Sequence, residues 1–348
     1  MSILCSDATA TARGRNRLRR VGGLSTIIAG MLLCAGWPAA AAHPEDGPAW
    51  VTLGTGGGPL VRIKRGNTSN ALVVGQDVIL FDAGEGVVHG LAAAGLRLDQ
   101  VRAIVLSHLH PDHTAGLATL ITLRWQNNLT APIVVYGPVG TSELVAGILA
   151  SNKPAERAGY AAPGAAIPSA DRSVSARELA CTGESTAIGA VQFVSIGNTH
   201  YLYPDGREPS DARSCAFRVT VGGRSVVYTG DTGPSDAVTK LAKGADLLVS
   251  EVIDISATMK ALRAVTQAMK PEARDAMIFH LTHHHLTPED VGRMAAAASV
   301  GEVVLTHLAP GLDGEQSTSG YVDGVRRLYH GSVIAASDGD RFPLKMVP

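Results

Sequence analysis

Ser107-His108-Leu109-His110-Pro111-Asp112-His113 places three imidazoles and one carboxylate within six consecutive residues. The apolar run 103–106 comes directly before this stretch, and a helix-like stretch begins at Thr114. A strand is therefore expected to lead into the loop and a helix to follow it. Imidazole nitrogens and carboxylate oxygens are the ligands of borderline metals such as zinc. The stretch thus predicts a metal site at the end of a strand.

The spacing of these residues predicts two metal positions. In extended backbone, side chains two residues apart point to the same side, so His108 and His110 can share one ion. Asp112 and His113 follow the Pro111 bend and aim elsewhere, which suits a second ion nearby. The alternative is a loop of caps and surface side chains. It is disfavoured because four ligand-type residues gather in six positions.

The first residues of the chain differ from the rest. The chain has 348 residues and 45% apolar content, enough to bury one large core or two modest ones. Five arginines between Arg13 and Arg20, an apolar stretch at 24–35 and small residues at 40–42 predict a cleaved export signal over residues 1–42. A membrane anchor is the alternative, but a spanning helix needs roughly 20 apolar residues. The remaining chain, 43–348, is expected to be periplasmic or secreted.

The net charge of the chain indicates which partners it can bind, and its cysteines indicate its redox compartment. The whole chain has 30 basic and 31 acidic residues; residues 1–42 hold five Arg and Asp7, which leaves 25 basic and 30 acidic, a net charge near −5. Nucleic-acid binding depends on Lys and Arg that neutralise phosphates, so a nucleic-acid partner is not expected. Cys181 and Cys215 remain after the signal. They can pair in an oxidising compartment or stay as separate buried thiols.

Other segments repeat the pattern of an apolar run followed by a polar residue. Runs 71–74 and 78–81 predict a hairpin, and the glycine run 54–58 predicts a tight turn. A helix is expected from Thr141 or Ser142 to Leu149, then irregular structure over 151–186 that covers the active site. A further helix is capped by Thr287, with Pro288 in its first turn. Residues 321–329 predict a helix and 331–336 a closing strand.

His108-Leu-His110-Pro-Asp112-His113 matches the HxHxDH signature of the metallo-β-lactamase superfamily. The flanking segments resemble its ribonuclease Z-like and arylsulfatase-like branches, and the resemblance covers nearly all of residues 49–310. It implies an α/β fold, the αββα sandwich, in which two mixed β-sheets are flanked by helices. It also implies one hydrolase domain over residues 43–348 and two Zn²⁺ ions per chain, which other divalent transition metals can replace.

The resemblance also implies a ligand set. One ion is assigned to His108, His110, His200 and Asp231, and the other to Asp112, His113, His307 and Asp231, with Asp231 bridging the two. His200 is the only histidine between His113 and Phe279; its alternative role is that of a loop residue without a metal. Asp82 is expected to accept a hydrogen bond from the far nitrogen of a ligand histidine, with a helix cap as the alternative.

His285 lies in a His-x-Thr element that resembles the one that ribonuclease Z-like enzymes place over the leaving group. This resemblance implies that His285 is the general acid or oxyanion stabiliser, with Glu251 as its partner. His280, His283 and His284 are assigned to the surface or to supporting positions. Trp125, Tyr201 and Tyr203 are candidates for the pocket wall, with packing as the alternative.

The resemblance implies a hydrolase in which two metal ions lower the pKa of water toward about 7. Asp112 also orients the water and His285 protonates the departing oxygen. The expected substrate is a small phosphodiester or an aryl sulfate, so phosphodiesterase or arylsulfatase activity is predicted. Lactonase, β-lactamase or hydrolytic dehalogenase activity on the same scaffold remains an alternative, as does a non-catalytic zinc-binding module. The expected partner is a small-molecule substrate, with no membrane partner after signal cleavage; a homodimer is left open.

Overall fold

Two mixed β-sheets form the centre of the fold. The computed structural model describes residues 47–159, 168–315 and 317–344, so the predicted export signal lies outside the described residues. Within them, strands form two seven-stranded sheets. The first sheet runs in the order β14 (Arg341–Pro343), β1 (Ala49–Gly54), β2 (Ser69–Val74), β3 (Asp77–Ala83), β4 (Val101–Val105), β5 (Ile133–Gly137) and β6 (Val174–Glu178). The second runs in the order β13 (Ser332–Ala335), β12 (Glu302–Ala309), β11 (Leu247–Ile253), β10 (Arg224–Tyr228), β9 (Cys215–Val221), β8 (Val191–Gly197) and β7 (Thr182–Ile188).

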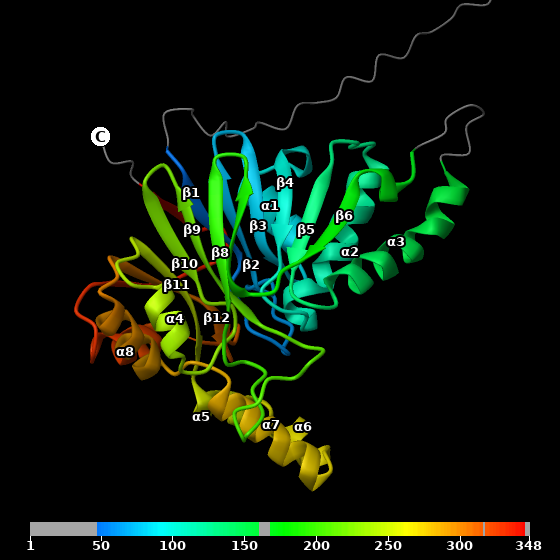
Figure 1. Cartoon of the computed structure of the whole chain (residues 1–348). Helices are drawn as coiled ribbons and strands as arrows, with labels where there is room; N and C mark the ends of the chain where they lie inside the picture. The colour runs from blue at the N-terminus through cyan, green and yellow to red at the C-terminus, as the bar shows by residue number, and fades with distance from the viewer. Residues whose placement is uncertain (1–46, 160–167, 316, 345–348) are drawn as a thin grey trace, which may run out of the picture. The chain divides into compact units, whose positions relative to one another are not determined.

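Helices cover the outer faces of both sheets (Figure 1). The helices are α1 (Val87–Ala93), η1 (Leu98–Gln100), α2 (Pro111–Gln126), α3 (Thr141–Ala158), η2 (Ala170–Arg172), α4 (Asp236–Leu241), α5 (Ile255–Ala261), α6 (Arg263–Ala268), α7 (Pro271–His283), α8 (Pro288–Ala298) and α9 (Ser319–Arg326). Helices α1–α3 lie against the first sheet and α4, α8 and α9 against the second. The predicted αββα sandwich is therefore confirmed.

The main core lies between the inner faces of the two sheets. Aromatic rings from both sheets meet there: Trp50 and Phe81 contact Tyr228, with ring centroids 5.9 and 6.3 Å apart, and Phe81 contacts Phe217 at 6.0 Å. All four side chains are fully buried. In each sheet one half pairs in parallel, from β3 to β6 and from β10 to β13. Parallel strands end at the same sheet edge, so the residues that follow them meet there.

Several local predictions are confirmed. Strands β2 and β3 form the hairpin around Gly75, which has a left-handed φ of 58°. The side chain of Thr287 caps α8 by accepting a hydrogen bond from the Asp290 backbone N–H, and Pro288 is in the first turn. Helix α9 and strand β13 occupy the predicted C-terminal segments.

The expectation of irregular structure over residues 151–186 is wrong for most of the described part of that segment, and residues 160–167 lie outside the described residues. Helix α3 begins after Gly140 rather than at a Thr141 or Ser142 cap, and it continues past Leu149 to Ala158 with Pro154 inside it. Strands β6 and β7 follow; each forms an edge of its sheet and is largely exposed. An exposed edge strand needs no apolar alternation, so the sequence carried no periodic signal for it. Helices α5–α7 were not predicted either. No helix in the described part of the chain is long and apolar enough to span a membrane.

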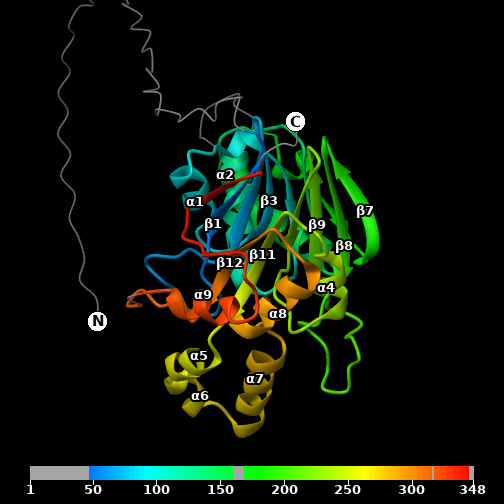
Figure 2. The same ribbon diagram turned by 90° about the vertical axis from the view of Figure 1, so that its left-hand side faces the viewer.

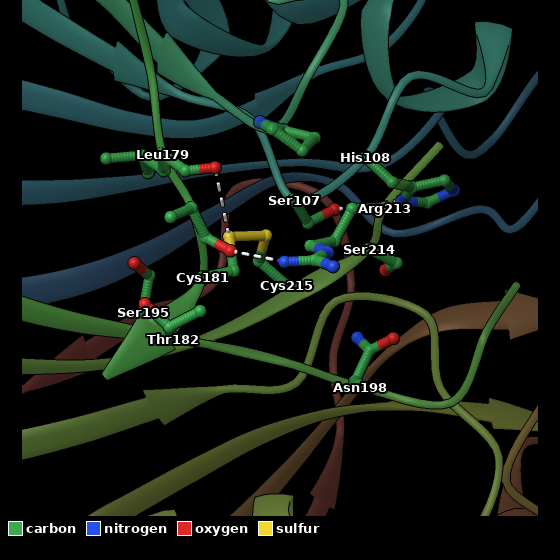
Figure 3. The surroundings of a disulfide bond; sticks show 12 residues. Ser107, His108, Leu179, Cys181, Thr182, Ser195, Asn198, Arg213, Ser214 and Cys215 are labelled. Atoms are coloured by element: carbon green, nitrogen blue, oxygen red, sulfur yellow. Dashed lines mark hydrogen bonds between the residues drawn. A yellow bond between two sulfur atoms is a disulfide. The ribbon is translucent and has the colours of Figure 1, made fainter. Parts of the chain in front are cut away.

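Cys181 and Cys215 form a disulfide, with Cα atoms 5.9 Å apart (Figure 3). It joins the start of β7 to the start of β9, and the Cys215 N–H donates to the Ser107 carbonyl at 2.9 Å. The crosslink therefore closes the segment that carries His200 and lies next to the loop of His108.

Replacing both cysteines with serine is expected to lower the free energy of unfolding by about 2–4 kcal/mol, since the 34-residue separation no longer restricts the unfolded chain. Urea denaturation of the wild type and the double variant measures this difference. The matched control is Ser175→Ala, which removes one exposed hydroxyl on β6 and leaves the crosslink in place. Equal midpoints for the wild type and the double variant would contradict the prediction.

Candidate active site

Three imidazoles converge at the end of β4. His108 Nε2 lies 3.1 Å from His110 Nδ1, and His200 Nε2 lies 3.1 Å from the same atom. His200 follows β8, so two distant segments meet here, one from each sheet. Burial lowers the pKa of all three rings below the ordinary imidazole value. They are therefore neutral near pH 7, the form in which an imidazole binds a metal.

The tautomers of two of these rings are set by their neighbours. His200 Nδ1 lies 2.9 Å from the His284 carbonyl, which can only accept, so Nδ1 carries the proton and Nε2 faces the site. Ser107 Oγ donates to the Asp82 carboxylate at 2.7 Å and lies 3.0 Å from His108 Nδ1. It therefore accepts from that nitrogen, and His108 Nε2 also keeps a free lone pair.

A second group lies beside the first. It consists of Asp112 and His113 at the start of α2, Asp231 after β10 and His307 in β12. Asp112 Oδ2 lies 3.5 Å from His113 Nε2 and 3.3 Å from His307 Nε2. Burial alone would lower the pKa of His113 and His307, but the carboxylates outweigh it and raise both, His307 to about 10. This group therefore attracts a cation.

Asp231 lies between the two groups. Its Oδ2 is 3.3 Å from His113 Nε2 and 3.1 Å from His307 Nε2. The same oxygen is 3.8 Å from His108 Nε2 and 3.9 Å from His200 Nε2. Burial would raise the pKa of Asp231, but His113 and His307 outweigh it and hold the pKa well below its usual range. A charged carboxylate at this point faces both groups.

The donor set fits two metal ions. The first group supplies three neutral nitrogens and the second two nitrogens and two oxygens, a set that suits borderline divalent ions. His113 Nε2 and Asp231 Oδ1 are buried and have no hydrogen-bond partner among the described residues. Buried polar atoms are rarely left unpaired, and a bound ion accounts for such atoms. The two groups are consistent with a dinuclear metal site.

All seven residues predicted as ligands thus lie together, although their roles as ligands stay predictions. They come from the ends of β4, β8 and β10, from the start of α2 and from β12. His307 has a left-handed φ of 46°. Ser250 pairs with Leu305 and Val252 with Leu308, so β12 has one extra residue beside Glu251. Such a bulge changes the direction of a side chain, and here it accompanies the residue that faces Asp112 and Asp231.

Asp82 holds the far side of His113. Its Oδ2 accepts hydrogen bonds from His113 Nδ1 at 2.8 Å and from the Tyr228 hydroxyl at 2.6 Å, while Oδ1 accepts from the Ser107 N–H at 2.6 Å. The predicted hydrogen bond to this histidine is confirmed. Asp82 also has a left-handed φ of 62°, which aspartate and asparagine tolerate better than most residues.

Asp82→Asn is expected to lower metal affinity about 10–100-fold, the usual effect of losing a partner that orients a ligand histidine. Asparagine keeps the size and backbone preference of Asp82 but has one acceptor oxygen in place of two. Competition with a chromophoric chelator measures the affinity. The control is Asp99→Asn, the same change at an exposed site paired with Arg97. Unchanged affinity in a folded Asp82→Asn variant would contradict the prediction.

Gly57 and Gly58 lie directly against the second group. A Cβ on Gly57 would come within 2.6 Å of the His307 ring, and one on Gly58 within 2.5 Å of the Asp112 carboxylate. The Gly58 N–H donates to Asp112 Oδ2 at 2.7 Å. The glycine run therefore permits close approach of the backbone to ligand residues, a role that its interpretation as a tight turn did not include.

Glu251 and His285 form a buried pair at the edge of the site. His285 Nδ1 lies 2.6 Å from Glu251 Oε2, and Oε1 accepts from the Thr232 N–H at 2.5 Å. Burial lowers the pKa of His285, but the Glu251 carboxylate outweighs burial and raises it. A raised pKa favours the protonated imidazole that a general acid requires. The predicted contact is confirmed, and the catalytic role stays a prediction.

The neighbouring histidines divide into three environments. His283 is exposed, and His284 is buried and contributes its carbonyl to His200. His280 lies in the site itself: its ring centroid is 4.7 Å from that of His200 and 5.3 Å from that of His285. Burial lowers its pKa to about 3. The assignment of His280 to the surface or a supporting position therefore missed a site residue. The four-residue spacing of His280 and His284 on a helix was the available signal.

Tyr201 and Trp125, two of the candidates for the pocket wall, lie in different parts of the fold. Tyr201 lies beside the first group, with its ring centroid 5.1 Å from that of His110. Trp125 is buried in the core under the first sheet. It lies twelve residues beyond His113 on α2, about 18 Å along the helix axis. The alternative of simple packing is therefore correct for Trp125.

The fold and the site together define a class of protein: an αββα sandwich with buried histidine–aspartate clusters, consistent with a dinuclear metal site, at one sheet edge. A family model described as Beta-lactamase superfamily domain matches residues 78–308. Ribonuclease Z from Mycolicibacterium paratuberculosis (strain ATCC BAA-968 / K-10) is 33% identical over 267 residues, which cover 75% of this chain and 86% of that protein. The chain belongs to the metallo-β-lactamase superfamily, in its ribonuclease Z-like branch. It is a metal-dependent hydrolase of the phosphodiesterase-like kind.

Solved structures agree on the fold. The metallo-β-lactamase fold protein YhfI from Bacillus subtilis has a TM-score of 0.59 and 19% identity, covering 85% of this chain and 99% of its own. The short form of human tRNase Z has a TM-score of 0.58 and 22% identity, covering 86% of this chain and 100% of its own.

Proposed function

We propose that this chain is a dinuclear zinc phosphodiesterase that hydrolyses small phosphodiesters, with aryl sulfates as the second substrate class. The position of Asp231 carries the proposal, since one carboxylate oxygen faces both ligand groups at 3.1–3.9 Å. Such a bridging carboxylate is typical of the phosphodiesterase, sulfatase and glyoxalase-like branches of the superfamily. Zinc is proposed because the donors are imidazoles and carboxylates, which it binds readily.

Asp112 and His285 have different roles in the proposed hydrolysis. Two bound zinc ions would supply an activated water at neutral pH and charge stabilisation for the ester oxygens. Asp112 Oδ2 lies between His113 and His307, where it can also orient the attacking water. His285, held by Glu251, gives its proton to the departing oxygen. General acid catalysis of this kind contributes roughly 10²–10⁴-fold.

RNA is an alternative candidate substrate, and the 33% identity to ribonuclease Z favours it. Tight RNA binding requires clustered Lys and Arg around the site. Two of the segments beside the site, Tyr203–Ser214 and Lys270–His283, carry five acidic and four basic residues. This balance supports a small substrate over a polyanion.

A paired substrate screen tests the proposal. Purified protein with measured metal content is assayed on bis(p-nitrophenyl) phosphate, p-nitrophenyl sulfate, a lactone, a β-lactam and an RNA with a 3′ extension. We expect the phosphodiester to give the highest kcat/KM. A higher value on the lactone, the β-lactam or the RNA would overturn the substrate assignment. Bound metal without hydrolysis of any substrate would instead indicate a zinc-binding module.

We also propose that residues 43–348 act as one domain in the periplasm or outside the cell. The basic and apolar pattern of residues 1–42 supports export, and so does the Cys181–Cys215 disulfide, since such crosslinks persist in oxidising compartments. N-terminal sequencing of the protein from fractionated cells tests this. Full-length protein in the cytoplasmic fraction would contradict it.

A further inference from the structure

Helices α5–α7 form an excursion from the sandwich between Glu251 and His285. Figures 1 and 2 show them beyond the ends of the strands. They pack on a small apolar cluster in which Leu262 and Leu281 meet Ile253 and Ala309 from the ends of β11 and β12. The excursion thus begins and ends beside the proposed general acid, and α7 brings His280 into the site.

A groove of about 510 Å³ lies between α7 and the loop that follows His200. Tyr201 and Tyr203 line it from the loop side, and Phe279 and His280 line it from α7. Tyr203 is 49% exposed, so the outer end is open to solvent. At the inner end, His200 belongs both to the groove and to the first ligand group. The groove therefore runs from solvent to the metal site.

The inner end of the groove is on the leaving-group side. Ring nitrogens of His200, His280 and His285 lie within 4.8 Å of one another. In the proposed function, His285 gives its proton to the departing oxygen. A group attached to that oxygen therefore extends past His280 into the groove.

The walls suit a flat aromatic group. Phe279 and Tyr203 present rings, and Phe279 is fixed by stacking on His283 at 4.3 Å between centroids. The Arg207 guanidinium lies over the Tyr203 ring, 5.5 Å from its centroid. Aromatic rings favour offset or edge contacts with other rings over contacts with aliphatic groups of equal size.

We propose that this groove is the leaving-group pocket and that Phe279 and Tyr203 select a flat aromatic leaving group. The inference rests on the proposed phosphodiesterase function. Two sources supply such a group: the aryl alcohol of a small ester, or the base of a terminal nucleotide.

The test compares leaving groups of similar acidity. Methyl phenyl phosphate has an aromatic leaving group, and methyl hexafluoroisopropyl phosphate does not. The two departing alcohols have similar acidity, so their oxygens leave with similar ease. The double variant Phe279→Ala/Tyr203→Ala is expected to lower kcat/KM for the phenyl ester about 10-fold. The fluoroalkyl ester should change less than about twofold. A second pair of substrates consists of a dinucleotide and its counterpart that lacks the base on the departing nucleoside. The aromatic substrate on which the double variant loses more activity, the phenyl ester or the dinucleotide, identifies the source of the leaving group.

The control is Val265→Ala, an exposed apolar residue on α6 outside the groove, which should leave both esters unchanged. Phe279→Leu keeps apolar volume without a flat ring and replaces the double variant if that variant does not fold. Equal losses on the phenyl and fluoroalkyl esters would overturn the pocket while leaving the phosphodiesterase function in place. Absence of phosphodiester hydrolysis by the wild type would overturn the proposed function itself.

Discussion

Asp231→Asn is expected to lower hydrolysis by at least about 10⁴-fold and to reduce bound metal from two ions per chain to one or fewer. The variant keeps the shape of the side chain and removes its charge. Oδ2 of Asp231 is the one carboxylate oxygen that faces His108, His200, His113 and His307 together. Its loss therefore affects both ions, and with them the activated water. Elemental analysis gives the metal content, and bis(p-nitrophenyl) phosphate gives the rate.

The matched control for Asp231 is Asp236→Asn. Asp236 lies five residues further along, is exposed in the first turn of α4 and undergoes the same chemical change. It should retain wild-type metal content and rate. Circular dichroism of both variants shows whether the fold is kept. Two ions per chain in folded Asp231→Asn would show that this residue does not bridge the metals.

That the seven candidate ligand residues lie together could be predicted because each follows a strong local signal. Four lie within one contiguous stretch, so their proximity needs no knowledge of the fold. His200 and Asp231 follow apolar runs that become β8 and β10. Both strands are antiparallel to β9, so they run in the same direction and their carboxyl ends lie at a common sheet edge. Local patterns do not show which of these strand ends share a metal ion. The family resemblance indicated that grouping.

The excursion α5–α7 could not be predicted by the same reasoning. Helix α7 buries only Leu281 among its side chains, so no apolar stripe marks it as a helix. The position of His280 depends on how this helix returns to the sandwich, which is a property of tertiary packing. The left-handed backbone of His307 has the same origin, since it accompanies a bulge between β11 and β12.

The position of His285 permits two roles that sequence alone could not separate. Its Nδ1 contacts Glu251, its ring stacks on that of His307 at 5.8 Å between centroids, and one of its ring nitrogens lies within 4.8 Å of ring nitrogens of His200 and His280. A proton donor and a metal ligand would both use this geometry. The pairing with Glu251 raises the pKa of His285 despite burial, which supports the proton donor.

His285→Ala is expected to lower kcat about 10²–10⁴-fold and to leave two metal ions bound. The loss should depend on the leaving group, because a departing p-nitrophenolate needs a proton far less than an alkoxide does. Ethyl p-nitrophenyl phosphate and diethyl phosphate provide the two extremes, and a larger loss on diethyl phosphate identifies a general acid. His330→Ala, the same change at an exposed histidine between α9 and β13, is the control. If His285→Ala loses metal, His285 is a ligand; equal losses on both esters with metal retained would show that it stabilises charge without transferring a proton.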